Sequence, residues 1–138
     1  MNFINNKKNE TNFIILESID IYPLISVRNA LVENLMINYI CAIQAYEACY
    51  ETTWKILKSI LILDVLNKIE SMNFADIFFL AYQKGLISDH KSWINYHNKR
   101  NITSREYQEE IESKRNYKFL EEFIKDLDYL IINIKKMK

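Results

Sequence analysis

The apolar residues of this chain recur at helical spacing over most of its length. One stripe predicts a long helix from about Arg28 to Leu63, because its members advance in steps of three or four residues, the spacing of one face of an α-helix. A second stripe predicts another long helix that begins near Glu109. The first stripe is formed by Leu31, Leu35, Tyr39, Ala42, Tyr46, Tyr50, Trp54, Leu57 and Leu61, and the second by Phe119, Phe123, Leu127, Leu130 and Ile134.

Proline, glycine and capping side chains mark the ends of shorter helices. Pro23 is expected to end a helix over about 11–21, because proline lacks the backbone N–H that continues a helix. Ser71 or Asn73 is suited to cap the next helix. The only glycine in the chain, Gly85, is expected to terminate that helix, since glycine readily adopts the left-handed backbone that follows many helices.

A fourth helix is predicted to begin after Ser88 or Asp89 and to end near Asn101. The polar residues 1–10 are expected to form a flexible terminus. Residues 11–138 contain no repeat and no interdomain linker, so the pattern predicts a single domain. Few, long elements with short connections favour an all-α fold, an antiparallel, up-and-down bundle of about five helices.

The composition supports a helical fold and excludes several classes of function. With one Gly and one Pro among 138 residues, the chain lacks the tight turns of sandwiches, barrels and doubly wound sheets. A single glycine also excludes the glycine-rich phosphate loops of nucleotide-binding folds. Lys plus Arg and Asp plus Glu number 18 each, so no net field draws the whole molecule to nucleic acid or to a membrane, and only a local basic site remains open.

The two cysteines, Cys41 and Cys49, lie eight residues apart in one predicted helix. They are then separated by roughly 12 Å, which is too far for a disulfide bond. We expect two small buried apolar side chains, no metal site, no cofactor and a cytoplasmic location. No apolar stretch approaches the roughly 20 residues of a membrane span, and the start of the chain does not resemble a signal peptide.

Polar side chains that are suited to bind a ligand or take part in catalysis gather between Trp93 and Tyr107. Arg100 and Arg105 are suited to bracket a phosphate, because the guanidinium fork matches phosphate oxygens. His97 precedes Arg100 by one helical turn and shares its face of the helix. The alternative interpretation is a solvated helix end with a Thr or Ser cap, and the pattern by itself leaves both open.

Glu47 and Glu51 form a second polar site within an otherwise apolar helix. Two carboxylates one turn apart are able to act as acid and base or to bind a metal ion. The alternative is a face that pairs with a partner chain. Tyr50 and Trp54, which lie beside these carboxylates, are candidate anchors of a dimer or of the bundle core.

Three blocks of the chain resemble the HEPN-domain proteins that are paired with minimal nucleotidyltransferases, also called nucleotidyltransferase substrate-binding proteins. Residues 42–58 (AIQAYEACYETTWKILK) resemble the pattern F-E-x-x-Y-E-x-x-W-K, and residues 76–87 (DIFFLAYQKGLI) resemble D-x4-A-x3-G-L-I. Residues 93–107 (WINYHNKRNITSREY) resemble W-x6-R-N-x-T-S-H-x-Y. The blocks occur in the family's order and spacing, and together they span about residues 40–107.

The resemblance implies a helical bundle that dimerises and brings two R-x4-H motifs together as an RNA-cleaving site. It also implies a cognate nucleotidyltransferase antitoxin that transfers AMP to the tyrosine of R-x4-H-x-Y. In this chain, Arg100 matches the motif arginine, Asn101 the polar residue that follows it, and Tyr107 the AMP acceptor. Arg105 stands where the family has histidine.

The arginine at the histidine position changes the expected chemistry. Metal-free RNA cleavage requires that the 2′-hydroxyl lose a proton and the leaving oxygen gain one, and histidine can do either near neutral pH. Arg105 keeps its charge because the pKa of arginine is above ~12, so it cannot act as a base, although it can hold a phosphate. We therefore expect an impaired or inactive ribonuclease, with His97, Glu47 and Glu51 as supporting residues.

The sequence favours the HEPN toxin of a toxin–antitoxin pair, which cleaves or binds RNA and is regulated by AMP on Tyr107. The alternative is a non-catalytic, nucleotide-binding subunit that partners a minimal nucleotidyltransferase. A third hypothesis is a helical interaction module without a ligand. The expected partners are a second copy of the chain, the nucleotidyltransferase, and RNA or a nucleotide, with no membrane involved.

Overall fold

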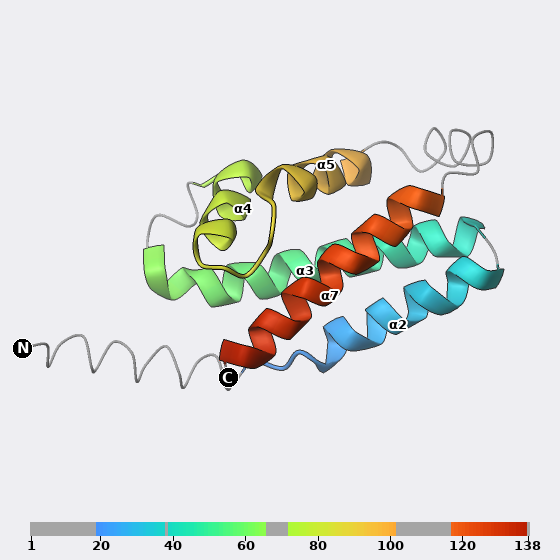
Figure 1. Ribbon diagram of the computed structural model, residues 1–138, viewed down its shortest axis with the longest axis horizontal. Coiled ribbons are helices and arrows are strands. Elements are labelled where there is room, and N and C mark those ends of the chain that lie inside the picture. The colour runs from blue at the N-terminus through green and yellow to red at the C-terminus, as the bar shows by residue number, and fades with distance from the viewer. Residues whose placement is uncertain (1–18, 38, 66–71, 102–116, 138) are drawn as a thin grey trace, which may run out of the picture.

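The structure, a computed structural model, describes residues 19–37, 39–65, 72–101 and 117–137. These residues contain five helices and no strand: α2 (Tyr22–Ile37), α3 (Tyr39–Val65), α4 (Phe74–Gln83), α5 (His90–Asn101) and α7 (Tyr117–Met137). The helices α2, α3, α5 and α7 run alternately in opposite directions, and the short α4 lies beside the C-terminal end of α3 (Figure 1). The predicted all-α, up-and-down bundle is therefore confirmed.

The prediction of one continuous helix over Arg28–Leu63 was wrong. Two helices, α2 and α3, occupy this region and pack against each other as an antiparallel pair. The apolar stripe keeps its spacing from one helix to the next, so its pattern contains no signal of the break. A single helix over this range would be roughly 54 Å long. Folding back instead allows Leu31 of α2 to become fully buried, while Met36 and Ile37 at the end of α2 stay exposed.

Pro23 begins a helix rather than ending one. It lies in the first turn of α2, where the backbone N–H has no intrahelical partner and its loss costs nothing. Asp20, which precedes the helix, accepts a hydrogen bond from the N–H of Tyr22 at 2.9 Å. Residues 19–21 are not helical, and the rest of the helix expected over 11–21 lies outside the described residues.

The predicted caps of α4 and α5 are confirmed. The side chain of Asn73 accepts a hydrogen bond from the N–H of Asp76 at 2.9 Å, and the Asp76 carboxylate accepts one from the N–H of Asn73, which completes a capping box. Gly85 follows α4 with a positive φ of 78°. Asp89, rather than Ser88, caps α5, because its carboxylate accepts a hydrogen bond from the N–H of Lys91 at 3.0 Å.

The core contains buried side chains from all five described helices. Every apolar position predicted for the second stripe is buried on α7, whereas the start of that helix, expected near Glu109, lies outside the described residues. Tyr46 of α3 packs edge-on against Phe119 and Phe123 of α7, with ring centroids 5.1 and 4.7 Å away. Such edge-to-face contacts add to the stabilisation that burial provides.

The cysteines are both free, in agreement with their predicted spacing, but they differ in burial. Cys49 is fully buried, and burial raises the pKa of its thiol to about 12. Cys41 is exposed, so the expectation that both thiols are buried was wrong for this residue. The two positions lie eight residues apart on α3, which places them about 80° apart around the helix and lets only one face the core.

We expect Asn73→Ala and Asp89→Ala each to lower the free energy of unfolding by about 1 kcal/mol, because each removes the acceptor that caps a helix. Ser88→Ala serves as the control, since its side chain is exposed and does not cap α5. Urea unfolding of the three variants checks this. If Ser88→Ala lowers the free energy of unfolding as much as Asp89→Ala does, the assignment of Asp89 as the cap is contradicted.

Candidate functional site

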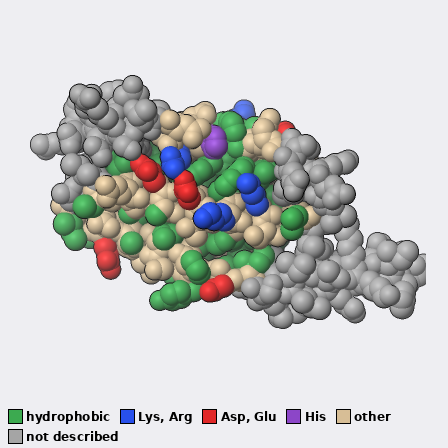
Figure 2. Space-filling view, turned by 180° about the vertical axis from the view of Figure 1, so that it is seen from behind, with side chains coloured by type: hydrophobic (Ala, Val, Ile, Leu, Met, Phe, Trp, Pro, Cys, Tyr) green, Lys and Arg blue, Asp and Glu red, His purple; other side chains and the backbone are tan. Residues whose placement is uncertain are grey.

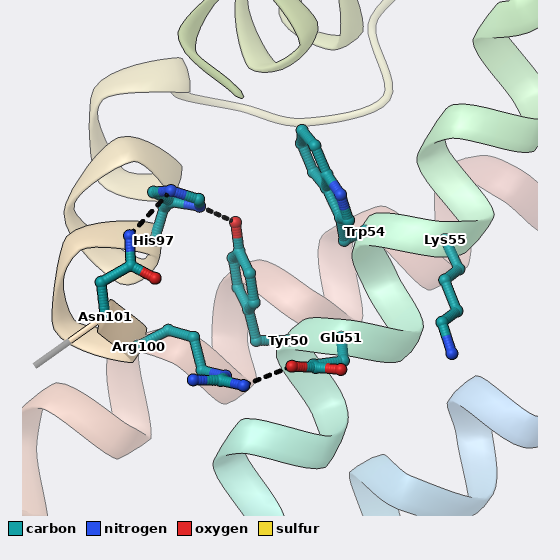
Figure 3. A pocket seen from close by; sticks show the side chains of 7 residues that line it. All are labelled: Tyr50, Glu51, Trp54, Lys55, His97, Arg100 and Asn101. Atoms are coloured by element: carbon teal, nitrogen blue, oxygen red, sulfur yellow. Dashed lines mark hydrogen bonds and ion pairs between the residues drawn. The ribbon is translucent and has the colours of Figure 1, made fainter. Parts of the chain in front are cut away.

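A pocket with a volume of about 260 Å³ opens between α3 and α5 (Figure 3). Each helix contributes residues from a single face, because its lining residues recur at intervals of three or four positions. The lining residues are Tyr50, Glu51, Trp54 and Lys55 from α3, and His97, Arg100 and Asn101 from α5. Charged, aromatic and amide side chains therefore converge on one opening.

Glu51 holds Arg100 at this pocket. Nη2 of Arg100 donates a hydrogen bond to Oε1 of Glu51, and the two side chains form an ion pair (Figure 3). The pair is open to solvent, with side-chain exposures of 31% for Arg100 and 51% for Glu51. Nε of Arg100 is buried and has no hydrogen-bond partner among the described residues. The guanidinium group is thus oriented by Glu51 and keeps donor capacity for an anion.

His97 is held on three sides. Asn101 places its Nδ2 3.1 Å from Nε2 of His97, and with this amide orientation Nε2 accepts the hydrogen bond. Nδ1 then carries the proton and donates to the hydroxyl oxygen of Tyr50. Phe74 of α4 stacks on the imidazole, with ring centroids 3.8 Å apart and an angle of 13° between the planes. Both ring nitrogens of His97 are therefore engaged within the protein.

The surroundings of the pocket keep two of its titratable side chains neutral. Burial lowers the pKa of His97 below its ordinary value of 6.5, and the positive charge of Arg100 lowers it further. Burial also raises the pKa of Tyr50 well above its ordinary value of 10. The formal charges of the lining are then those of Glu51, Lys55 and Arg100. Two cations and one carboxylate leave a net positive site, which is suited to an anion such as a phosphate.

The structure places only some of the site residues that the sequence predicted. It brings Arg100, Asn101, His97 and Glu51 together in one pocket. Glu47 does not line this pocket, so the two carboxylates do not act as a pair there. Arg105 and Tyr107 lie outside the described residues. Among the described residues, no group of three or more His, Cys, Asp or Glu side chains is placed to hold a metal ion.

Four residues of the site were missed or assigned differently from the sequence. Tyr50 and Trp54, the predicted anchors of a dimer or of the bundle core, do pack in or against the core, but the sequence did not predict that both also line the pocket. Lys55 follows Glu51 by one helical turn, and this spacing was the available signal that it shares the same face. Phe74 carries no sequence signal of its contact with His97, because that contact depends on how α4 packs against α5.

The fold and the pocket together define an all-α bundle with an anion-suited site between two of its helices. The chain belongs to the family described as nucleotidyltransferase substrate binding protein like, which matches residues 25–136. None of the helices in the described parts of the chain is long and apolar enough to span a membrane.

A curated protein sequence and a solved structure, both from Haemophilus influenzae, are similar to this chain. One, named "Probable ribonuclease HepT", is 33% identical over 97 residues, which cover 69% of this chain and 66% of that protein. The other is the solved structure of HI0074, described as the fold of a substrate binding domain of a nucleotidyltransferase. It superimposes with a TM-score of 0.65 and 25% identity over 89% of this chain and 98% of that one.

We expect the pKa of His97 to be below 6.5, because the folded chain desolvates the imidazole and places Arg100 beside it. Proton NMR titration of the histidine Cε1–H signals measures this. Only two histidines are present, so the His97→Gln variant assigns the signal. Since the unfolded chain takes up this proton at higher pH than the folded one, His97 contributes stability that is lost as the pH falls below about 6.5.

The Arg100→Ala variant should move the pKa of His97 upward, because it removes a positive charge that lowers this pKa. Burial, the larger cause of the lowered pKa, remains in the variant. The Arg28→Ala variant is the matched control, since Arg28 forms an ion pair with Asp128 between α2 and α7 rather than at the pocket. An unchanged pKa in Arg100→Ala, or an equal change in Arg28→Ala, would show that the charge of Arg100 does not act on His97.

Proposed function

We propose that this protein is the HEPN toxin component of a toxin–antitoxin pair and that the pocket between α3 and α5 binds the phosphates of RNA. The single observation that carries the proposal is the state of Arg100. Glu51 orients its guanidinium group through one N–H of Nη2, and the side chain is 31% exposed, which leaves further Nη–H donors for a ligand. A phosphate oxygen matches this geometry, and the similarity to a protein named as a probable ribonuclease supports RNA as the source of the phosphate.

Cleavage would proceed by attack of the RNA 2′-oxygen on the adjacent phosphorus. The new O–P bond forms while the bond from phosphorus to the 5′-oxygen breaks, and the proton lost by the 2′-hydroxyl must be balanced by one gained at the leaving oxygen. Arg100 is suited to stabilise the negative charge that develops on the phosphate. Arg105, at the position of the family's histidine, cannot accept the proton. Both nitrogens of His97 are already engaged, so His97 is a poor substitute.

These features favour binding over cleavage in this chain. The second candidate function, a non-catalytic subunit that binds a nucleotide and partners a nucleotidyltransferase, is favoured by the same absence of a free imidazole from the described pocket. A second copy of the chain would bring two such motifs together. Both functions include a homodimer and a cognate nucleotidyltransferase, and they differ in whether the RNA is cut.

Restoring histidine at position 105 should restore cleavage. We expect Arg105→His to cut RNA about 100- to 10,000-fold faster than the parent chain in the absence of metal, which is the usual contribution of a general acid or base. Gel analysis of a labelled RNA in the presence of a chelator measures the rates. Adding Arg100→Ala to the Arg105→His chain should abolish the gain, whereas adding Arg28→Ala should preserve it. If Arg105→His cuts no faster than the parent, the toxin assignment gives way to the non-catalytic subunit.

AMP transfer to Tyr107 should occur when the protein is co-expressed with an adjacent nucleotidyltransferase that carries a G-S-x-D-x-D motif. An AMP group beside Arg100 and Arg105 would occupy the phosphate site by charge and bulk. Mass spectrometry should then find one adenylyl group on the peptide that contains Tyr107. Tyr107→Phe should lose this modification, while Tyr82→Phe, which changes an exposed tyrosine on α4, should retain it. An unmodified Tyr107 in the parent chain would contradict the proposed regulation.

A further inference from the structure

Trp54 forms an aromatic wall of the pocket, and among the described residues no other ring stacks parallel to its indole. Its two ring neighbours, Phe78 and His97, lie with centroids 5.6 and 6.3 Å away and are tilted by 57° and 49°. The ammonium group of Lys58 lies over the indole ring, 4.9 Å from its centroid. Lys58 is exposed, so a flexible side chain rather than a packed element occupies this position. The other tryptophan, Trp93, is only 1% exposed and belongs to the core.

Two positive side chains, Lys55 and Lys58, follow Trp54 along α3. Lys55 and Lys58 follow Glu51 by one and two helical turns, so they share its face of the helix. Within the described parts of the chain neither lysine has an ion-pair partner, since the carboxylate of Glu51 pairs with Arg100. On the face seen in Figure 2, Lys and Arg side chains lie beside Asp and Glu side chains, hydrophobic surface and a histidine. Lys58 at the ring, and Lys55 and Arg100 in the pocket lining, thus place cations near a partly exposed indole ring.

We propose that this pocket takes a single-stranded segment of RNA, with one unpaired base stacked on Trp54 and the flanking phosphates at Arg100, Lys55 and Lys58. The inference rests on the proposed function and specifies its substrate. Indole rings stack on any base, and cations beside them follow the phosphate backbone. A base within a duplex is already stacked on its neighbours and cannot reach the ring. The incoming base displaces the Lys58 ammonium, which then meets a phosphate.

Fluorescence titration with an uncleavable ligand tests this inference. The probe is a 2′-O-methyl oligonucleotide of mixed sequence, offered as a single strand and, separately, annealed to its complement. Inorganic phosphate is the control for binding of a phosphate anion without a base. A poly-glutamate peptide is the control for binding of an acidic protein surface. Because Trp93 is buried, a change in emission on binding reports Trp54. We expect the single strand to quench the emission, the duplex to bind at least tenfold more weakly, and phosphate and peptide to leave the emission unchanged.

Variants of Trp54 separate stacking from charge. Trp54→Leu should weaken binding of the labelled single strand about 5- to 150-fold by fluorescence anisotropy, which is the range for loss of one stacked base. Trp54→Phe should retain most of the affinity while losing the quenching, and circular dichroism confirms that each variant is folded. Unchanged affinity in Trp54→Leu, equal affinity for the duplex, or quenching by phosphate or by the peptide would overturn the inference.

The inference and the proposed function fail in different ways. If stacking is wrong but the function is right, Arg100→Ala abolishes RNA binding while Trp54→Leu binds normally. If the cleavage assignment is wrong but stacking is right, the single strand still quenches Trp54 although Arg105→His does not cut RNA. Arg28→Ala removes an arginine from an ion pair between α2 and α7 that does not line the pocket, and it should leave both binding and quenching unchanged.

Discussion

The packing of α5 against α3 connects the core of this bundle to its pocket through three successive contacts. The buried Tyr46 donates a hydrogen bond to the backbone carbonyl of Tyr96. One turn further along α3, the hydroxyl of Tyr50 meets His97, the residue that follows Tyr96 on α5, and Glu51 then pairs with Arg100. The contacts change from fully buried to solvent-open along the same two helix faces. This register orients the charged side chains, because the inner contacts allow the helices only one alignment.

The electrostatic character of the pocket arises locally rather than from the whole molecule. The chain carries 18 basic and 18 acidic side chains, so its overall field is close to neutral. At the pocket, burial keeps His97 and Tyr50 uncharged, and the remaining charges are two cations and one carboxylate. Since Glu51 is engaged with Arg100, the carboxylate orients the guanidinium group without occupying all of its donors. A neutral protein can therefore present a site that favours anions.

Local signals predicted the ends of several helices correctly and failed where the signal was not local. Asn73, Gly85 and Asp89 act as predicted, because a cap depends on a hydrogen bond or a backbone angle within a few residues. Pro23 was misread, since proline marks the first turn of a helix as readily as it prevents the continuation of one. The break between α2 and α3 was missed because apolar residues keep helical spacing on both sides of it.

The sequence by itself determined the helical class, the buried stripe of α7, the family resemblance and the shared helix face of Arg100 and His97. These properties depend on periodicity, composition and motif, which are written in consecutive residues. Only the tertiary structure decided that Glu51 rather than Glu47 meets Arg100, and that Trp54 and Lys55 join them. Two residues on the same helix face are equally plausible partners in a sequence. The register between α3 and α5, set by packing in the core, selects between them.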